Sequence, residues 1–380
     1  MPPIENDAHW MEAEIGTTPE LELKLERIRG LLGRRSLNAL LLQSVDNFAW
    51  ATCGAGSYVN VAASTGGASL LITPKGRYVV TDNIESVRLE QEEHLRGQGW
   101  ELLVAPWYED NPGITDLTRG LKLGADGPYP KATDLSAALR GLRANLTPEE
   151  GARFRRLGHL CSEAMDAAIR AVRPGMTEHQ IAGLLAGQVL CRGVQPTVNL
   201  IATDERVFQF RHPLPTGKRL EAYAMLVLCG RMQGLVCSIT RFVHFGPLPD
   251  ELRRKADAVA SIDARLIEAT RPGRRLCDIF SLAIEAYGAV GFADEWRRHH
   301  QGGSAGYAPR EITATPQTEA EVLTGQAYAW NPSIAGTKSE DTILVGVDEN
   351  EVLTSIPGWP VTSVTVNGRA VDRPAILEVT

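Results

Sequence analysis

The feature that most constrains the fold is an internal repeat in the second half of the chain. Arg173-Pro174-Gly175 recurs 98 residues further along as Arg271-Pro272-Gly273. Two further pairs keep the same ungapped register, Ile181 with Ile279 and Gly193 with Gly291. Each copy has the pattern of a helix, an Arg-Pro-Gly turn, a second helix and a glycine turn that leads into strands. A duplicated unit of this size predicts a pseudo-twofold domain whose site lies between the halves, where strands from both copies converge.

A smaller α/β domain is predicted ahead of the repeat, over residues 20–142. Apolar spacing predicts helices over residues 20–34 and 84–98, and short apolar runs predict strands over residues 39–42, 68–73, 78–81 and 101–105. Thr147, Pro148 and Glu150 have the pattern of a helix start with a capping box, so we place the second domain over residues 147–370. Residues 1–19 are polar and are interpreted as an extension.

Composition narrows the class of protein. The chain has 380 residues, of which 43% are hydrophobic and 22% charged, as in ordinary globular proteins. Its net charge of −7 disfavours a nucleic-acid partner, because an acidic surface repels phosphate backbones. No apolar run approaches the length of a membrane span, and the acidic N-terminus does not have the pattern of a signal peptide. Six cysteines without a CxxC pair indicate free thiols in a reducing cytoplasm.

Several motifs occur in an order that points to a known family. They are RPGMTEHQIA, HPLPTGKRL, AMLVLCG, SITRF, LTGQAYAWNPSI and SEDTILV. Together they resemble the creatinase/aminopeptidase family, which includes Xaa-Pro dipeptidases, aminopeptidase P, methionine aminopeptidase and creatinase. The resemblance implies an α+β fold, in which an N-terminal creatinase-type α/β domain precedes a C-terminal pita-bread domain built from the pseudo-twofold repeat. It also implies a homodimer.

The resemblance also implies where metal ligands would stand. Peptidases of this family hold two divalent metals with two Asp, one His and two Glu. Matching those motifs to this sequence places Leu228 at the first Asp, Ser238 or a deletion at the second, Gly303 at the His and Asn331 at the first Glu. Only the last ligand, Glu340, is retained, and Arg310 replaces a neighbouring His. We therefore expect no dinuclear metal site and no cofactor.

A histidine that needs no metal completes the candidate site. His212, in Phe208-Gln209-Phe210-Arg211-His212-Pro213, matches the family position where creatinase has its general acid/base. We therefore predict His212 and Glu340 as catalytic residues and Arg310 and Asn331 as substrate-binding residues. A histidine with an ordinary pKa near 6.5 shuttles protons at neutral pH. Two alternatives stay open: His212 caps the turn before Pro213, and Arg241 is a structural salt-bridge partner.

The preferred function is a metal-independent hydrolase or lyase that acts on a small, carboxylate-bearing or short peptide-like substrate in the cytoplasm, without nucleic acid or membrane. One alternative is a non-catalytic binding protein, as the large subunit of the histone chaperone FACT is within this family. Another is an Xaa-Pro peptidase with a rebuilt metal site.

Three other patterns carry weaker interpretations. Residues 302–306 match the G-x-S-x-G nucleophile elbow, but no buried strand precedes them and no histidine follows His300, so the required Ser–acid–His order is impossible. His299 and His300 are adjacent, and adjacent residues of an extended chain point to opposite faces, so we expect a solvated basic edge and no shared metal. Cys229 and Cys237 are expected to be buried thiols without a catalytic role.

Overall fold

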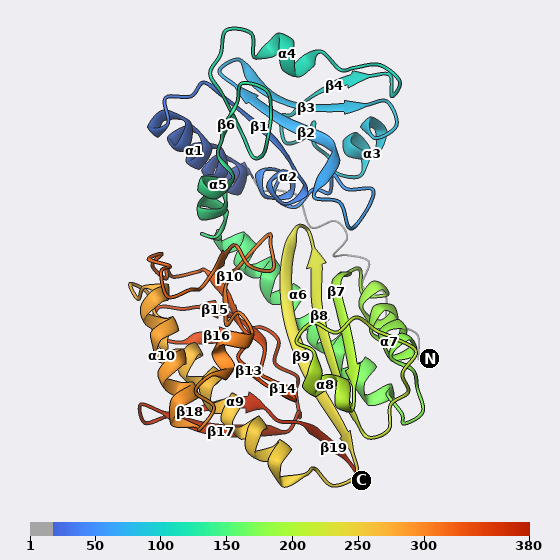
Figure 1. The fold of residues 1–380 in the computed structure, drawn as a ribbon. Coiled ribbons are helices and arrows are strands. Elements are labelled where there is room, and N and C mark those ends of the chain that lie inside the picture. The colour runs from blue at the N-terminus through green and yellow to red at the C-terminus, as the bar shows by residue number, and fades with distance from the viewer. Residues whose placement is uncertain (1–17) are drawn as a thin grey trace. The chain divides into compact units, whose positions relative to one another are not determined.

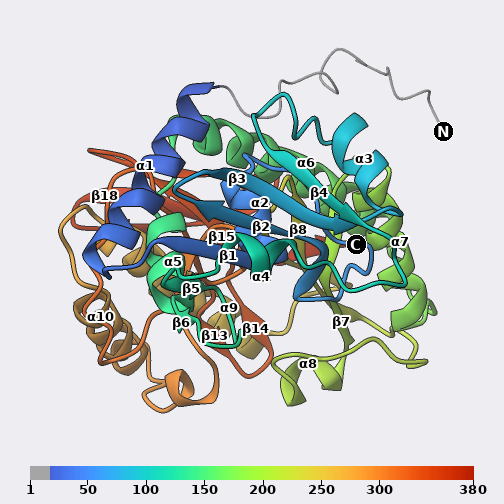
Figure 2. The same ribbon diagram turned by 90° about the horizontal axis from the view of Figure 1, so that it is seen from above.

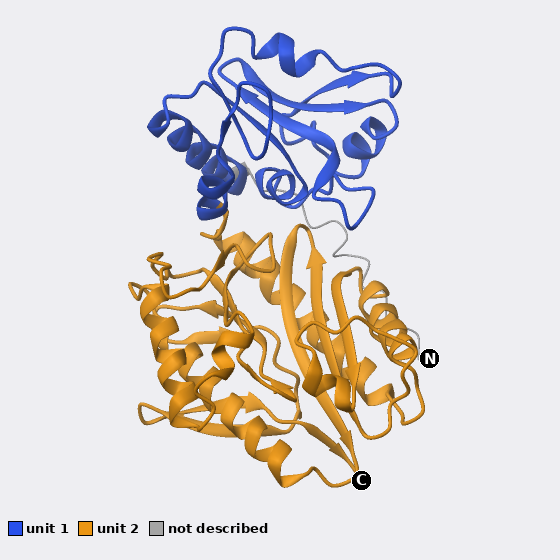
Figure 3. Ribbon diagram, in the orientation of Figure 1, with its two compact units in different colours: residues 1–142 blue, residues 143–380 orange. Residues whose placement is uncertain are grey.

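The computed structural model describes residues 18–380. By its contacts the chain divides into two compact units, residues 1–142 and residues 143–380 (Figure 3). The predicted N-terminal extension lies outside the described residues, except for positions 18 and 19, which begin the first helix. Over residues 18–380 no helix is both long and apolar enough to cross a membrane.

Unit 1 is an α/β unit built on a six-stranded sheet with the strand order β4-β3-β2-β1-β5-β6 (Figures 1 and 2). The strands are β1 (Ala39–Ser44), β2 (Thr65–Thr73), β3 (Gly76–Asp82), β4 (Glu101–Ala105), β5 (Leu123–Ala125) and β6 (Thr133–Asp134). The helices are α1 (Thr18–Arg34), α2 (Val45–Ala51), α3 (Ser86–Gln91), α4 (Gly113–Leu117) and α5 (Ser136–Arg143), which ends at the boundary.

Apolar spacing predicted helix α1 correctly but predicted a helix longer than α3. All five apolar residues of the predicted face of α1 are buried: Leu21, Leu25, Ile28, Leu31 and Leu32. The helix predicted over residues 84–98 is shorter, since α3 ends at Gln91. His94 and Gly99 have φ angles of 52° and 78°, and a right-handed helix cannot continue through such residues.

Unit 2 contains two larger sheets, with the strand orders β19-β9-β8-β7 and β11-β10-β12-β15-β16, and two short ribbons, β13-β14 and β17-β18 (Figure 1). Its helices are α6 (Pro148–Ala171), α7 (Glu178–Leu190), α8 (Glu205–Gln209), α9 (Asp250–Ala269), α10 (Leu276–Ala289) and the 3₁₀ helix η2 (Glu295–Arg298). Its strands are β7 (Gln195–Thr203), β8 (Tyr223–Met232), β9 (Leu235–Phe245), β10 (Gly302–Ala305), β11 (Ile312–Thr313), β12 (Ala327–Trp330), β13 (Ser333–Ile334), β14 (Thr337–Lys338), β15 (Asp341–Val345), β16 (Asn350–Val352), β17 (Val361–Val366), β18 (Arg369–Pro374) and β19 (Leu377–Val379).

Helix α6 opens unit 2 with the capping box that the sequence predicts. The Thr147 backbone N–H donates to Glu150 Oε2 at 2.7 Å, and the Glu150 N–H donates to Thr147 Oγ1 at 3.2 Å. These bonds satisfy backbone donors that the first helical turn otherwise leaves unpaired. The helix then packs against β8 and β9, so it supports the sheet that carries half of the candidate site.

The sequence repeat corresponds to a structural repeat. In each copy the glycine of the Arg-Pro-Gly turn donates its backbone N–H to a carbonyl in the segment that precedes a strand. Gly175 donates to the Leu220 carbonyl at 2.7 Å, before β8, and Gly273 donates to the Val322 carbonyl at 2.9 Å, before β12. Gly193 and Gly291 both have positive φ angles, of 72° and 83°. The first copy is therefore α6, α7 and the strands β7–β9, and the second is α9, α10 and the strands of the β10 sheet.

The two copies meet along β9 and β15, where the two sheets are joined by hydrogen bonds. The Ser238 N–H donates to Thr342 Oγ1 at 2.9 Å, and the Thr240 N–H donates to the Glu340 carbonyl at 3.2 Å. This seam brings side chains that are about 100 residues apart in the sequence into contact.

Candidate functional site

Glu340 lies at the seam and is surrounded by cations of the protein itself. It is 3% exposed, between β14 and β15. Its Oε2 accepts from Thr240 Oγ1 at 2.6 Å and from Lys338 Nζ at 2.8 Å, and its Oε1 accepts from Arg310 Nη2 at 3.1 Å. Burial opposes ionisation of this carboxyl, but the charges of Lys338 and Arg310 outweigh it and hold the pKa well below its usual range. Glu340 is therefore an ionised carboxylate with both oxygens occupied.

Arg310 lies at the site, as the sequence predicts, in the turn between β10 and β11. Its Nη1 donates to Ser238 Oγ at 3.3 Å and to the Pro309 carbonyl at 2.6 Å. The next residue, Glu311, is buried, accepts from Arg143 at 2.8 Å and anchors the turn. Three of the five N–H groups of Arg310 make these bonds and the bond to Glu340; of the other two, the Nε–H is buried and has no partner within residues 18–380.

Lys338 is a site residue that the sequence reasoning missed. It is 8% exposed and ion-paired with Glu340. A signal was present in the sequence, because residues two apart on an extended chain lie on the same face. The spacing of Lys338 and Glu340 therefore indicates that the lysine can reach and neutralise the carboxylate.

The strand register corrects the match at the first Asp position. Leu228 pairs with Ile239, whereas Cys229 lies directly opposite Ser238, with Sγ and Oγ 3.3 Å apart. Cys229, not Leu228, therefore shares the face of Ser238 that looks toward Arg310 and Glu340. Burial, together with the charge of Glu340, raises the pKa of the Cys229 thiol to about 11, so it is a neutral thiol at pH 7.

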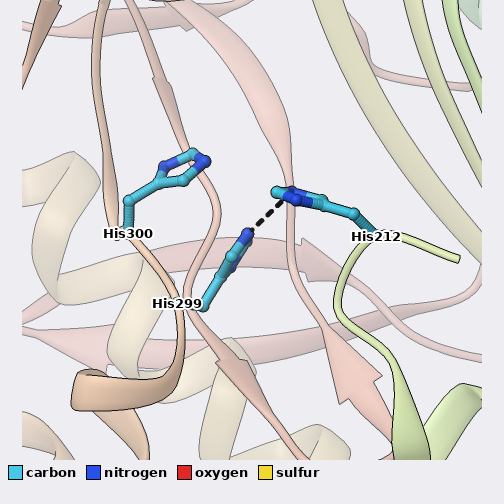
Figure 4. Close-up of side chains that lie close together, drawn as sticks. All are labelled: His212, His299 and His300. Carbon is cyan, nitrogen blue, oxygen red and sulfur yellow. Dashed lines mark hydrogen bonds between the residues drawn. The ribbon is translucent and has the colours of Figure 1, made fainter.

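Three histidines of unit 2 face one another beside these residues (Figure 4). His212 follows α8, and His299 and His300 link η2 to β10. His212 Nε2 and His299 Nε2 are 3.1 Å apart, and one ligand nitrogen from each of the three rings lies within 4.8 Å of the others. The expectation that His299 and His300 point to opposite faces was wrong. The two residues connect a 3₁₀ helix to a strand and do not lie in a regular strand, so alternation does not govern them.

All three histidines favour the neutral form. Burial and then the nearby charge of Lys338 lower the pKa of His299 to about 2, and burial and then Arg310 lower that of His300 to about 4. The pKa of the more exposed His212 is lowered for the same reasons, burial first and Lys338 second, while Glu340 opposes the shift. His212 thus offers a lone pair for proton transfer at neutral pH.

Asn331 is buried between β12 and β13. Its backbone N–H donates to the Gln301 carbonyl at 3.0 Å, and within residues 18–380 its buried Oδ1 has no hydrogen-bond partner. An unpaired buried amide oxygen costs free energy unless a ligand or water satisfies it. The Asn331 amide oxygen is thus an unsatisfied buried acceptor, and no hydrogen bond within residues 18–380 joins it to Glu340 or Arg310.

Other sequence candidates have structural roles. Arg241 is buried, pairs with Asp341 at 2.8 Å and donates to the Thr354 carbonyl at 2.9 Å, so it is the structural salt-bridge partner. Ser304 is buried within β10 and its Oγ accepts from the Ile312 N–H at 3.1 Å, which confirms that no nucleophile elbow exists there. A cavity of about 770 Å³ lies beside Trp359, but arginines and acids at its wall pair with one another.

The comparisons with known proteins now place this fold. The model of metallopeptidase family M24 matches residues 152–347. The chain belongs to family M24. An uncharacterized peptidase of Staphylococcus aureus is 24% identical over 234 residues, which are 58% of this chain and 65% of that protein. An Xaa-Pro dipeptidase of Pyrococcus horikoshii is 20% identical over 348 residues, which are 87% of this chain and 96% of that protein.

Solved structures share the fold over most of the chain. The Xaa-Pro dipeptidase from Bacillus anthracis superimposes with a TM-score of 0.78 at 18% identity, covering 94% of this chain and 100% of that one. The N-terminal domain of the FACT complex subunit SPT16 from Cicer arietinum gives a TM-score of 0.69 at 12% identity, covering 90% of this chain and 97% of that one. The fold of this chain is therefore shared by a protein named as an Xaa-Pro dipeptidase and by the N-terminal domain of a FACT complex subunit.

The residues of this chain do not fit the dinuclear metal centre that M24 peptidases imply. Cys229 and Ser238 stand on the face where two Asp carboxylates are expected, and hard divalent metals prefer carboxylate oxygens. The Glu340 oxygens are both held by cations. A side chain at Gly303 would place its Cβ 2.0 Å from the Ile312 carbonyl oxygen, so the backbone leaves no room for a histidine ligand there.

Proposed function

We propose that this chain is a hydrolase or lyase that works without a dinuclear metal centre, with His212 as acid/base and a small, carboxylate-bearing substrate. The observation that carries the proposal is the pairing of both Glu340 oxygens with Lys338 and Arg310. These side chains supply fixed positive charge in a site where M24 peptidases are expected to hold metal ions. Fixed charges aimed at a reacting group stabilise a developing oxyanion without reorganisation.

His212 would perform the proton transfer. It is exposed and neutral, so it can accept a proton from water or from the substrate and return it to the leaving group. Its ring is oriented by the 3.1 Å hydrogen bond between its Nε2 and that of His299. Glu340 would hold Lys338 and Arg310 in place and would not itself act as a base, since its pKa is far below neutrality.

The charge of the site favours an anionic substrate. Lys338 and Arg310 carry two positive charges against the single negative charge of Glu340, so the three residues leave one net positive charge. The two remaining N–H groups of Arg310 match a carboxylate, and the Asn331 amide can bind a neighbouring polar group. A free amino terminus, as in an Xaa-Pro dipeptide, would be repelled by the same charges.

The test measures turnover by chelator-treated protein whose metal content has been checked by elemental mass spectrometry. The substrates are creatine, N-acetylglycine, N-carbamoylglycine and the dipeptide Gly-Pro. We expect turnover of at least one acylated or amidinated carboxylate without metal. His212→Asn should reduce it by about 10²–10⁴-fold, whereas His159→Asn, on an exposed position of α6, should not change it.

Two outcomes would overturn the proposal. Cleavage of Gly-Pro only after manganese or zinc is added would restore the peptidase interpretation. Saturable binding of these compounds with no turnover by the wild-type protein would favour the binding protein. The homodimer and the cytoplasmic location stay predictions, and sedimentation of the purified protein tests the first of them.

A further inference from the structure

Two neutral imidazoles of this site already stand at the separation that a tetrahedral metal ion imposes. Zinc–nitrogen bonds of about 2.0–2.1 Å put two ligand nitrogens about 3.3 Å apart in a tetrahedron. The His212 and His299 Nε2 atoms are 3.1 Å apart. The third ring, His300, has its centroid 4.5 Å from that of His299 and 5.9 Å from that of His212.

Figure 4 shows the three rings converging from two chain segments on one space. His212 comes from the first copy of the repeat, whereas His299 and His300 come from the second. All three ligand nitrogens lie within 4.8 Å of one another, close enough for the three rings to face one ion. Three nitrogen ligands leave a fourth position of the ion open to water or a ligand.

The chain segments that carry these rings are fixed by their neighbours. Arg211, next to His212, is ion-paired with Glu295 of η2, which ties the two segments together. Gln301 donates from Nε2 to the His299 carbonyl at 2.7 Å, and Ser333 Oγ is 3.4 Å from His299 Nδ1. Contacts of this kind orient imidazole ligands and strengthen metal binding.

We propose that His212, His299 and His300 bind one divalent transition-metal ion of the zinc class. The site uses none of the positions of the dinuclear M24 centre. Its three ligands are all nitrogens, so it selects zinc, copper or cobalt over manganese and magnesium, which prefer oxygen. The net positive charge of Lys338, Arg310 and Glu340 nearby repels a cation and lowers the affinity of the site for the metal ion, so the ion binds reversibly.

Binding at this site has a consequence that rests on the proposed function. An ion on His212 Nε2 takes the lone pair that the acid/base step requires. Zinc therefore inhibits turnover, with a midpoint equal to its dissociation constant for the site.

The binding test needs no substrate. Chelator-treated protein is titrated with Zn²⁺ against a chromophoric chelator, in a Cys191→Ser/Cys277→Ser background that removes the two cysteines that are not buried. We expect one ion per chain. His299→Asn and His300→Asn should each weaken binding at least 10-fold, whereas His179→Asn, at an exposed position of α7, should leave it unchanged. Mn²⁺ should not compete.

If a variant fails to fold, X-ray absorption spectroscopy of the wild-type protein with one equivalent of Zn²⁺ still tests the proposal, because it reports the ligands of the bound ion. Three imidazoles on the ion are expected. Sulfur ligands, fewer than two imidazoles, equal binding of Mn²⁺, or affinity unchanged in both histidine variants would overturn the site. A protein that binds zinc through these histidines but turns over no substrate would refute the proposed function alone.

Discussion

Replacing Lys338 with methionine tests whether this lysine stabilises the buried carboxylate of Glu340. The two charged groups are 2.8 Å apart and nearly inaccessible. At an effective dielectric constant near 20 such a pair attracts by roughly 6 kcal/mol, which the desolvation of both groups offsets in part. We expect Lys338→Met to lower the free energy of unfolding by about 3 kcal/mol at pH 7, since Arg310 still faces the other oxygen.

A surface pair provides the matched control. Lys218 and Glu205 are 3.0 Å apart, but Glu205 is 59% exposed. Lys218→Met should therefore destabilise the protein far less than Lys338→Met does. Urea unfolding measures both variants, and a double-mutant cycle with Glu340→Gln should give a coupling of about 2 kcal/mol for the buried pair. Hydrogen exchange in β9 and β15 shows whether unit 2 is the part that unfolds.

The loss of stability caused by Lys338→Met should also depend on pH. The pKa of Glu340 is depressed in the folded protein, so its contribution to stability is complete above the unfolded value of about 4.3 and decreases as the pH falls below it. Lys338→Met raises the pKa of Glu340 in the folded protein toward its unfolded value, so the gap to wild type should be constant above the pKa of Glu340 in the variant and narrow as the pH falls below it. A gap that does not narrow under acid, or one that at pH 7 is no larger than that of Lys218→Met, would refute the reasoning.

Three further predictions follow from the same site. Gly303→Ala should destabilise by at least about 2 kcal/mol in urea unfolding, because its Cβ would lie 2.0 Å from a carbonyl oxygen, whereas Gly183→Ala, in open space on α7, should not; equal stability of both would contradict the packing. Cys229, with its pKa raised to about 11, should react with iodoacetamide at pH 8 far more slowly than exposed Cys191, as mass spectrometry would show. For the proposed reaction, activity should rise with pH through a midpoint below 6.5 and stay level to pH 8, because the pKa of His212 is lowered; a midpoint above 6.5 would contradict a neutral His212 base.

Much of the fold could be predicted, because the relevant signals are local or repeated. The capping box of α6 and the Arg-Pro-Gly turns each depend on a few neighbouring residues. The strand register around Cys229 could not be predicted from local signals. Strands β8 and β9 form a hairpin with a two-residue turn at Gln233 and Gly234. Loss of one residue from a hairpin turns the side chains of a strand to the opposite face of the sheet, whereas loss of two residues keeps them on the same face. The number of residues before Ser238 does not show which of these two changes has occurred.

The side chains around the site were harder to predict because they depend on contacts between distant segments. His299 and His300 turn toward His212 through the irregular link between η2 and β10, where no periodic rule applies. The pairing of Arg310 with Glu340 requires the two copies of the repeat to dock. Residue types directed attention to His212, Arg310, Asn331 and Glu340 but not to Lys338, and which side chains neutralise one another follows only from the packing.

The packing around Gly303 also bears on how such a protein could evolve. Recovering a family-type metal centre would require new ligands at Cys229, Ser238, Gly303 and Asn331 and the loss of both cations beside Glu340. Taken singly, a side chain at Gly303 collides with the backbone, and loss of Lys338 leaves a buried carboxylate poorly compensated. Either of these two steps is expected to lower stability before any metal can bind. The packing around Gly303 and the cations beside Glu340 therefore oppose a stepwise return to the dinuclear centre.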